Sequence, residues 1–340
     1  MRTFDDVVQN PGRLAGTGSA RYQGSERGKR LLPAVVDELA RVAPNDLWIS
    51  LARGHVAPQG FEDINYGRLS NAVNRTARWL QEHVPESETT AAAYLGPSDA
   101  RYPVLMLAAS KAGLVMFLPS PFNAMDAQRE LLEATGSSVL LHAASHSTSA
   151  LEIAQSTSVR CIAVPEQIEL LDETPVDEIA FLKKYEEERS KPFVILHTSG
   201  TTSTPKPISL PHGYYAYEDL SQTSLFTNDF DAMTSAATPT GTRCLVTAPM
   251  WHAGGIFFGL LKPLLNQIKA LLPPVGLPIT ADLVHAYLSR GQADVLQTAP
   301  SVAADLAGEP RYAPVVKALQ AIIIGSGPME KAAGDQLLAL

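Results

Sequence analysis

One run of the sequence, HTSGTTSTPKP at residues 197–207, combines residue types that can bind a polyphosphate. Six of the seven residues from Thr198 to Thr204 carry a hydroxyl group, the seventh is Gly200, and Lys206 follows two positions later. A triphosphate requires many hydrogen-bond donors and a positive charge, and this run supplies hydroxyls, backbone N–H groups and one ammonium. ATP chemistry is therefore the leading hypothesis.

The run differs from the Walker A motif, in which the lysine lies at the start of a helix. Pro205 and Pro207 flank Lys206 and exclude a regular helix at that point. A Ser/Thr-rich surface loop without a ligand is the alternative interpretation of this composition. The apolar residues 193–196, which predict a buried strand, and the lysine held between two prolines favour phosphate binding.

The elements before this run alternate between short apolar strands and helices. An amphipathic helix follows residue 66, with apolar side chains at the i, i+3, i+4 spacing from Leu69 to Leu80. Strands are also predicted at 48–51, 64–66, 91–95, 115–118, 139–141 and 161–164, and helices at 33–43, 102–112 and 127–135. This alternation indicates an α/β fold with mostly parallel sheets flanked by helices.

The same alternation continues after the run. Strands are predicted at 244–247, 268–272, 295–298 and 321–324, and helices at 256–264, 280–289, 300–306 and from residue 330. Residues 1–30 are predicted to be a poorly ordered lead-in, and the charged residues 172–191 a solvated connection. Residues 31–340 would then form one domain with subdomains at about 31–190 and 191–340.

Composition excludes several classes of protein. With 45% apolar and 18% charged residues, the chain is globular and not disordered. The net charge of −8 argues against a nucleic-acid surface, and the two distant cysteines argue against a disulfide framework. The stretch 253–265 is well short of the ~20 apolar residues that span a bilayer, and no signal peptide is visible. The expected location is the cytoplasm.

The run from Thr198 to Lys206 resembles the phosphate-binding motif of the adenylate-forming superfamily, which contains acyl-CoA synthetases, luciferases and the adenylation domains of nonribosomal peptide synthetases (NRPS). Four further segments resemble motifs of this superfamily in its order: 64–69 (INYGRL), 111–121 (KAGLVMFLPSP), 249–255 (PMWHAGG) and 325–329 (GSGPM). Residues 197–200, 206–208 and 210–213 are most similar to fungal NRPS-like enzymes.

The resemblance implies a two-step reaction. A small carboxylic acid attacks the α-phosphate of ATP to give an acyl-adenylate and pyrophosphate, with Mg²⁺ as cofactor. A thiol, from the phosphopantetheine of a carrier protein or from CoA, then takes the acyl group. The protein's share of the first step is to neutralise phosphate charge and to hold the reactants in line. No nucleic acid and no membrane span are expected.

The resemblance also implies which residues form the site. Lys206 and His252 are the candidate catalytic residues, and no metal ligand is assigned. The nucleotide would be bound by these two side chains together with Thr198, Ser199, Gly200, Thr201, Thr202, Ser203, Gly325, Ser326 and Gly327. His252 would lie between the nucleotide and the acyl pocket, and a core histidine on a glycine-flanked turn is its alternative role. Residues 325–327 would let the backbone approach the adenine closely, and a tight strand-to-helix turn is compatible with that role.

The chain departs from the family pattern at several points. Ser203 and Pro207 stand where the family usually has glycine, and Ser203 could restrict the loop if that position needs a positive φ. The expected fold is the front part of the adenylate-forming N-terminal domain, with the C-terminal subdomain absent. The family motif whose acid serves Mg²⁺, the ribose-binding aspartate and the C-terminal catalytic lysine are not found after Gly327.

Three hypotheses follow. The first is an enzyme, or the N-terminal part of one, that adenylates a carboxylic acid in an NRPS-like secondary-metabolite pathway. The second is a truncated, catalytically inactive remnant or pseudoenzyme that retains partial nucleotide binding. The third, a generic α/β nucleotide-binding module, is disfavoured by the five ordered motifs.

Overall fold

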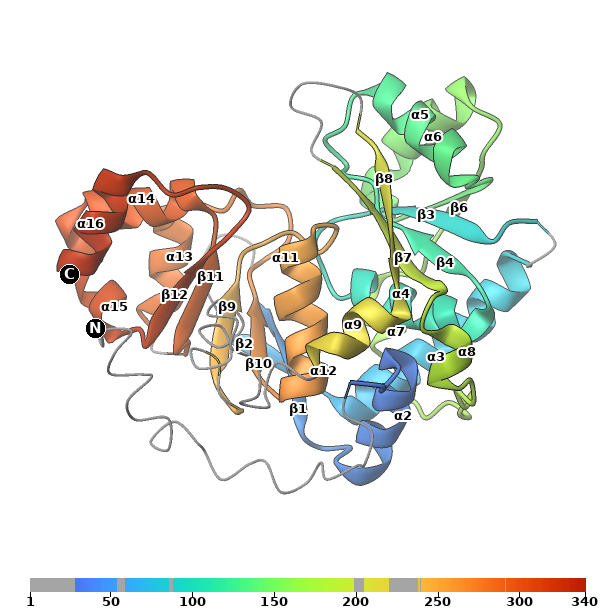
Figure 1. Ribbon diagram of the computed structural model, residues 1–340, viewed down its shortest axis with the longest axis horizontal. Helices are drawn as coiled ribbons and strands as arrows, with labels where there is room; N and C mark the ends of the chain where they lie inside the picture. Colours follow the sequence, from blue (N-terminus) through green and yellow to red (C-terminus); the bar gives the residue numbers. More distant parts are fainter. Residues whose placement is uncertain are drawn as a thin grey trace.

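The computed structural model describes residues 28–53, 59–85, 88–198, 205–219, 238, 240–290 and 292–340. Within these ranges the chain forms two six-stranded sheets, one in each half of the molecule, with helices packed on their faces (Figure 1). The predicted α/β class with mostly parallel sheets is confirmed. The lead-in predicted for residues 1–30 lies outside the described residues as far as residue 27.

The first sheet has the strand order β12-β11-β9-β10-β1-β2. Its strands are β1 (Leu47–Ala52), β2 (Phe61–Asn65), β9 (Arg243–Val246), β10 (Lys269–Leu272), β11 (Val295–Thr298) and β12 (Ala321–Ile324). Every neighbouring pair is parallel except β1 and β2, which are antiparallel at one edge. The carboxyl ends of β9, β11 and β12 therefore lie side by side.

The second sheet has the strand order β6-β5-β3-β4-β7-β8. Its strands are β3 (Ala91–Leu95), β4 (Val115–Phe117), β5 (Val139–His142), β6 (Arg160–Ala163), β7 (Pro192–His197) and β8 (Pro207–Pro211). Only β7 and β8 are antiparallel, as a hairpin. The sequence did not predict β8, because its prolines interrupt the apolar pattern. An edge strand tolerates proline, since one side of its backbone makes no ladder hydrogen bonds.

Sheet membership crosses the expected subdomain boundary at residue 190. β1 and β2 precede that boundary, but β1 pairs with β10, which follows residue 240. β7 and β8 follow the boundary and complete the sheet of residues 91–163. Each sheet is therefore built from both sides of the boundary.

Most α-helices of the described chain connect these strands, while the first precedes β1 and the last follows β12. They are α2 (Leu32–Val42), α3 (Tyr66–His83), α4 (Arg101–Ala112), α5 (Met125–Thr135), α6 (Ser147–Ser156), α7 (Gln167–Leu170), α8 (Tyr185–Glu188), α9 (His212–Glu218), α11 (Ala253–Ile256), α12 (Lys262–Asn266), α13 (Ala281–Leu288), α14 (Pro300–Gly308), α15 (Ala313–Ala318) and α16 (Lys331–Ala339). Thr280 caps α13, because its Oγ1 accepts a hydrogen bond from the N–H of Leu283 at 3.2 Å.

The helix predicted at 256–264 is longer and less regular than expected. It begins with α11, continues through the π-helical stretch Phe257–Leu261 and ends with α12. In Figure 1 this continuous orange helix lies between the two sheets. Its side chains share one apolar core with residues of both sheets. The helix therefore packs against both halves of the fold.

Most side chains of the segment 172–191 are exposed, as expected for a solvated connection, but parts of it pack against the fold. Phe181 and Glu188 are buried, at 8% and 4% exposed. Buried Lys111 donates a hydrogen bond from Nζ to the carbonyl of Ile179 at 2.7 Å, and the N–H of Phe181 donates to Asp37 at 3.0 Å. The segment is thus held against α2 and α4. The charge pattern of the sequence could not show this, because the anchoring groups are mainly backbone atoms.

The described part of the chain contains no helix with the length and apolarity that crossing a bilayer requires.

Candidate functional site

The β7–β8 hairpin brings Thr198 and Lys206 together. The N–H of Thr198 donates to the carbonyl of Lys206 at 3.0 Å, and the N–H of Lys206 donates to Thr198 Oγ1 at 3.1 Å. These reciprocal bonds extend the strand ladder by one step beyond the pair of His197 and Pro207. The predicted site residues Ser199, Gly200, Thr201, Thr202 and Ser203 lie outside the described residues.

Lys206 presents its positive charge to solvent. Its side chain is exposed, and no acidic residue within the described ranges forms an ion pair with it. The prolines on either side keep the backbone extended into β8, in agreement with the prediction that no helix starts here. An exposed ammonium at the base of a hydroxyl-rich hairpin is available to an anionic ligand.

His197 connects this hairpin to the turn that follows β4. Its Nε2 accepts a hydrogen bond from the N–H of Ser120 at 2.9 Å, with the Asn123 amide nitrogen at 3.3 Å. Because Nε2 accepts, the ring proton lies on Nδ1, which donates to the carbonyl of Thr198 at 2.8 Å. Both ring nitrogens are thus engaged. The sequence analysis gave no role to this residue.

His252 lies at the start of α11, on the side of the first sheet. Its Nδ1 accepts a hydrogen bond from the N–H of Gly254 at 3.3 Å, so the side chain caps the helix. The ring keeps an exposed edge, but the protein around it lowers its pKa by desolvation, and the nearby His197 lowers it further. The ring is therefore mostly neutral at pH 7. His197 belongs to the second sheet, and its effect on this pKa is the one interaction recorded between the two rings within the described residues.

Close packing holds the turn that carries His252. A Cβ atom on Gly255 would lie 2.1 Å from the carbonyl oxygen of Pro249, so only glycine fits without a backbone shift. The N–H of Met250 donates to Ser98 Oγ at 2.9 Å, and Ser98 belongs to the loop after β3. The turn is therefore held by its own close packing and by the hydrogen bond to the loop after β3 of the second sheet.

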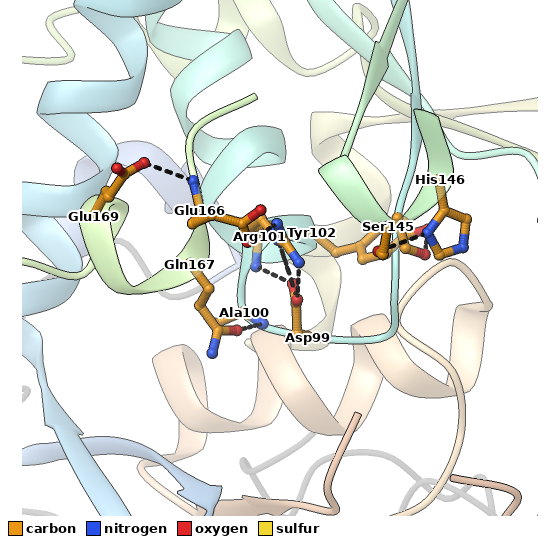
Figure 2. Close-up of polar contacts among 10 residues, drawn as sticks. Asp99, Ala100, Arg101, Tyr102, Ser145, His146, Glu166, Gln167 and Glu169 are labelled. Atoms are coloured by element: carbon orange, nitrogen blue, oxygen red, sulfur yellow. Dashed lines mark hydrogen bonds and ion pairs between the residues drawn. The ribbon is translucent and has the colours of Figure 1, made fainter. Parts of the chain in front are cut away.

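A buried ion-pair cluster holds that loop after β3 (Figure 2). Arg101 donates to both oxygens of Asp99, with the shortest distance 2.7 Å, and to Glu166 at 3.0 Å. Burial raises the pKa of Asp99, although the Arg101 guanidinium opposes this shift. The Gln167 side chain accepts from the N–H of Ala100 at 2.9 Å. The cluster joins the starts of α4 and α7 and so stabilises the loop that contacts Met250.

A second polar network lies at the carboxyl ends of β9 and β11. Buried Thr247 donates from Oγ1 to the carbonyl of Gln297 or to Thr298 Oγ1, both at 3.0 Å. Gln297 is 3% exposed, and its Oε1 accepts from the N–H of Ala248 at 3.0 Å. Sequence reasoning missed these residues, which it assigned to apolar strands. The sequence signal that could have identified them is a polar side chain at the end of each of two predicted strands.

Residues 325–327 continue from β12 at the same edge. The N–H of Gly325 donates to the carbonyl of Thr298 at 3.1 Å, which ties the segment to β11. The left-handed conformation falls on Ser326, with φ of 76°, and not on either glycine. A Cβ on Gly325 would meet nothing within 4 Å, and on Gly327 only Pro300 Cγ at 3.8 Å. The backbone of this turn is thus open to close approach by a ligand.

The site therefore has two sides, which are referred to below as the hairpin side and the strand-end side. The hairpin side consists of His197, Thr198 and Lys206. The strand-end side consists of His252, with Thr247, Gln297, Thr298 and residues 325–327. Among the described residues, no hydrogen bond or ion pair connects Lys206 to His252 or to the 325–327 turn.

Two surface grooves lie away from these residues. One, of about 420 Å³, lies between the ends of α5 and α6, and another, of about 540 Å³, lies between α2 and α8. Neither is lined by a predicted site residue. No group of three or more His, Cys, Asp or Glu side chains that could hold a metal ion occurs in the described ranges.

Comparison with known proteins decides the family. The family model described as AMP-binding enzyme matches residues 43–340. The chain belongs to this family. An isocyanide synthase-NRPS hybrid, crmA, of Aspergillus fumigatus is 30% identical over 89% of this chain and 20% of the relative. A carboxylic acid reductase of Neurospora crassa is 27% identical over 94% of this chain and 31% of the relative.

The AMP-binding fold is also found among solved structures. The O-succinylbenzoate coenzyme A synthetase MenE of Bacillus subtilis, in complex with AMP, superposes with a TM-score of 0.69 at 20% identity, over 90% of this chain and 56% of that one. The chain therefore has the fold of the N-terminal domain of adenylate-forming enzymes. It spans between a fifth and a third of the length of the two curated relatives.

Proposed function

We propose that this chain binds ATP and a small carboxylic acid and activates the acid as an acyl-adenylate, as part of an NRPS-like enzyme. The observation that carries the proposal is the closed base of the β7–β8 hairpin. Thr198 and Lys206 are held together by reciprocal hydrogen bonds, and Lys206 is exposed. In the sequence, the run between them is rich in hydroxyl-bearing residues. Family membership and the two fungal relatives support the same function.

In the proposed reaction, a carboxylate oxygen bonds to the α-phosphorus of ATP while the bond to pyrophosphate breaks. A thiol sulfur then bonds to the acyl carbon, and AMP leaves. The protein has to neutralise phosphate charge and align the reactants, since no covalent intermediate with the protein is needed. Lys206 and Thr198 are the described residues that would contact the β- and γ-phosphates.

The chain's residues fit a polyphosphate better than they fit an isolated metal ion. The hairpin supplies a cation and hydroxyls, which are phosphate ligands. Mg²⁺ would be held mainly by the phosphates, as is usual for this ion, with few protein carboxylates. When bound, it would neutralise part of the phosphate charge.

On the strand-end side, neutral His252 would contact the acid. Its Nδ1 is used by the N–H of Gly254, so Nε2 carries the ring proton and can donate a hydrogen bond to a carboxylate or acyl oxygen. Residues 325–327 would contact the adenine through their open backbone. The proposed acceptor thiol belongs to a phosphopantetheine carrier or to CoA, in a pathway of secondary metabolism.

Calorimetric titration with ATP and Mg²⁺ tests the proposal on the full chain. The wild type should bind ATP, and Lys206→Ala should bind it about tenfold more weakly, because one exposed charge-assisted contact is lost. Lys317→Ala, which removes an exposed lysine from α15, is the matched control and should bind ATP like the wild type. Equal ATP affinities for the wild type and Lys206→Ala would contradict the proposal.

A further inference from the structure

The half-buried ring of His197 is the one described side chain that bonds both to the hairpin and to the turn after β4. Its Nδ1 donates to the carbonyl of Thr198, the first residue of the run. Its Nε2 accepts from the N–H of Ser120, 77 residues earlier in the chain. The imidazole thus continues the contact between β4 and β7 beyond their last ladder pair, Phe117 and Ile195.

The Ser120 end of this bridge is itself fixed. The carbonyl of Ser120 accepts a hydrogen bond from Gln128 Nε2 at 2.8 Å, and Gln128 is a buried residue of α5 at 4% exposed. The N–H of Asn123 also donates to the carbonyl of Ser120 at 3.2 Å, which closes the turn. The backbone of Ser120 is therefore held on one side by a helix and on the other by His197.

The Thr198 end leads directly to Lys206. Thr198 exchanges two hydrogen bonds with Lys206, so any displacement of Thr198 is passed on to the lysine. A continuous series of contacts runs from Gln128 through Ser120, His197 and Thr198 to Lys206. The strength of a phosphate contact depends on how firmly the binding group is held, because a small displacement of that group removes much of its interaction energy with the phosphate.

We propose that His197 is a positioning residue for phosphate binding, which fixes the Thr198–Lys206 base of the hairpin against the turn at 120–123. The proposal rests on the proposed ATP-binding function. It assigns His197 no contact with the nucleotide. The bond to Ser120 should matter more for ATP binding than the bond to Thr198. Only the bond to Ser120 connects the hairpin to the turn at 120–123, since Thr198 is the next residue in the chain.

Two substitutions separate the two bonds of the ring. In His197→Gln, the Oε1 atom can occupy the place of Nε2 and accept from the N–H of Ser120. In His197→Asn, the Nδ2 atom can occupy the place of Nδ1 and donate to the carbonyl of Thr198. His197→Ala removes both bonds. His83→Ala, at the exposed end of α3, is the matched control.

Calorimetric titration of each full-length variant with ATP and with AMP tests the proposal, after thermal melting has shown that the variant is folded. His197→Ala should bind ATP about fivefold to tenfold more weakly, as expected for the loss of about one hydrogen bond, and AMP within twofold of the wild type. His197→Gln should recover most of the ATP affinity, and His197→Asn should not. The His83→Ala control should bind both nucleotides like the wild type.

Several outcomes overturn the proposal. If Lys206→Ala weakens ATP binding but His197→Ala does not, the positioning role is wrong and the proposed function stands. If His197→Ala weakens ATP and AMP equally, the residue acts on the fold in general. If the wild type does not bind ATP, the proposed function itself is wrong.

Gln128→Met keeps the test valid if His197→Ala does not fold. It removes the amide that holds Ser120 and preserves much of the side-chain volume. It should weaken ATP binding about threefold without weakening AMP binding, since it acts one contact further from the hairpin. An unchanged ATP affinity would count against the series of contacts.

Discussion

The two sides of the candidate site are stabilised in different ways. On the strand-end side, buried side chains bond the ends of parallel strands to one another, and Thr298 is 0% exposed. On the hairpin side, the exposed Lys206 depends on backbone bonds to Thr198 and on one half-buried imidazole. The strand ends thus form a rigid surface, whereas the hairpin holds its charge at the end of a short series of contacts.

This difference matches the tasks proposed for the two sides. Orienting the acid and the adenine requires fixed geometry, which buried hydrogen bonds and close packing provide. Binding a polyphosphate requires an exposed charge, which cannot be buried without a large desolvation cost. The comparison predicts that substitutions on the strand-end side mainly lower stability, while those at the end of the hairpin mainly lower phosphate affinity.

Gly255→Ala should produce the largest loss of stability. A Cβ at 2.1 Å from the Pro249 carbonyl oxygen forces the turn before α11 to move, and we expect a loss of about 3 kcal/mol or more in the free energy of unfolding. Urea unfolding measures this. Gly308→Ala is the matched control, since its Cβ would meet nothing within 4 Å, and it should change stability by less than about 1 kcal/mol. Similar effects of the two substitutions would contradict the tight packing of the turn.

The hairpin has a buried end as well, and this predicts a pH dependence. His212 follows β8, packs against Phe181 and Phe193, and is 5% exposed. Desolvation lowers its pKa to about 4, with further lowering by Lys183 and Lys191 and an opposing effect of Glu188. The unfolded chain, with a histidine pKa near 6.5, therefore binds the proton more strongly than the folded chain.

The stability that comes from the neutral His212 ring should be complete above about pH 6.5 and be lost as the pH falls toward 4. The loss at the acid end should be about 3 kcal/mol. In His212→Gln, the free energy of unfolding should fall less steeply between pH 6.5 and pH 4 than in the wild type. Denaturant melts at several pH values measure both slopes, and equal slopes would show that His212 is not the responsible group.

Thr247→Val should have a smaller effect on the strand-end side. It removes the hydroxyl that bonds to Gln297 and Thr298, and leaves buried polar atoms with fewer partners, at a cost of about 1–2 kcal/mol. Thr247→Ser keeps the hydroxyl and should lose less. Thermal unfolding of both variants compares them. A valine variant as stable as the wild type would mean that the network is not what holds the strand ends together.

Ser326→Gly should have the smallest effect, and it should be stabilising. Ser326 holds a φ of 76°, which glycine adopts without steric strain, and we expect a gain of about 0.5–1 kcal/mol. Ser326→Ala is the control, because it keeps the strain and should give no gain. A loss of stability in Ser326→Gly would show that the serine side chain has a bonding role that outweighs the strain.

Much of this fold follows from local sequence patterns. The apolar strands and the helix after residue 66 were predictable, because burial on both faces gives continuous apolar runs and one-sided burial gives helical spacing. β8 was missed, since its prolines are tolerated only at a sheet edge. The mixed sheet membership was also missed. Pairing between strands some 200 residues apart leaves no local signal, as for β1 and β10.

The candidate site was predictable to a lesser degree. The chemistry of Lys206 and the hydroxyl run is visible in residue types alone. The roles of His197, Thr247 and Gln297 are not, because they depend on which strand ends meet in space. Ser326 is a similar case, since residue types alone do not show that the positive φ falls on the serine and not on the flanking glycines.

Covalent labelling with an acyl-phosphate derivative of ATP tests the central claim most directly. Such a probe acylates lysines beside the bound phosphates, and peptide mass spectrometry identifies them. The account predicts that Lys206 is the main labelled lysine and that excess ATP suppresses its labelling. Labelling concentrated instead on Lys183 and Lys184, in the groove between α2 and α8, or unaffected by ATP, would contradict the account.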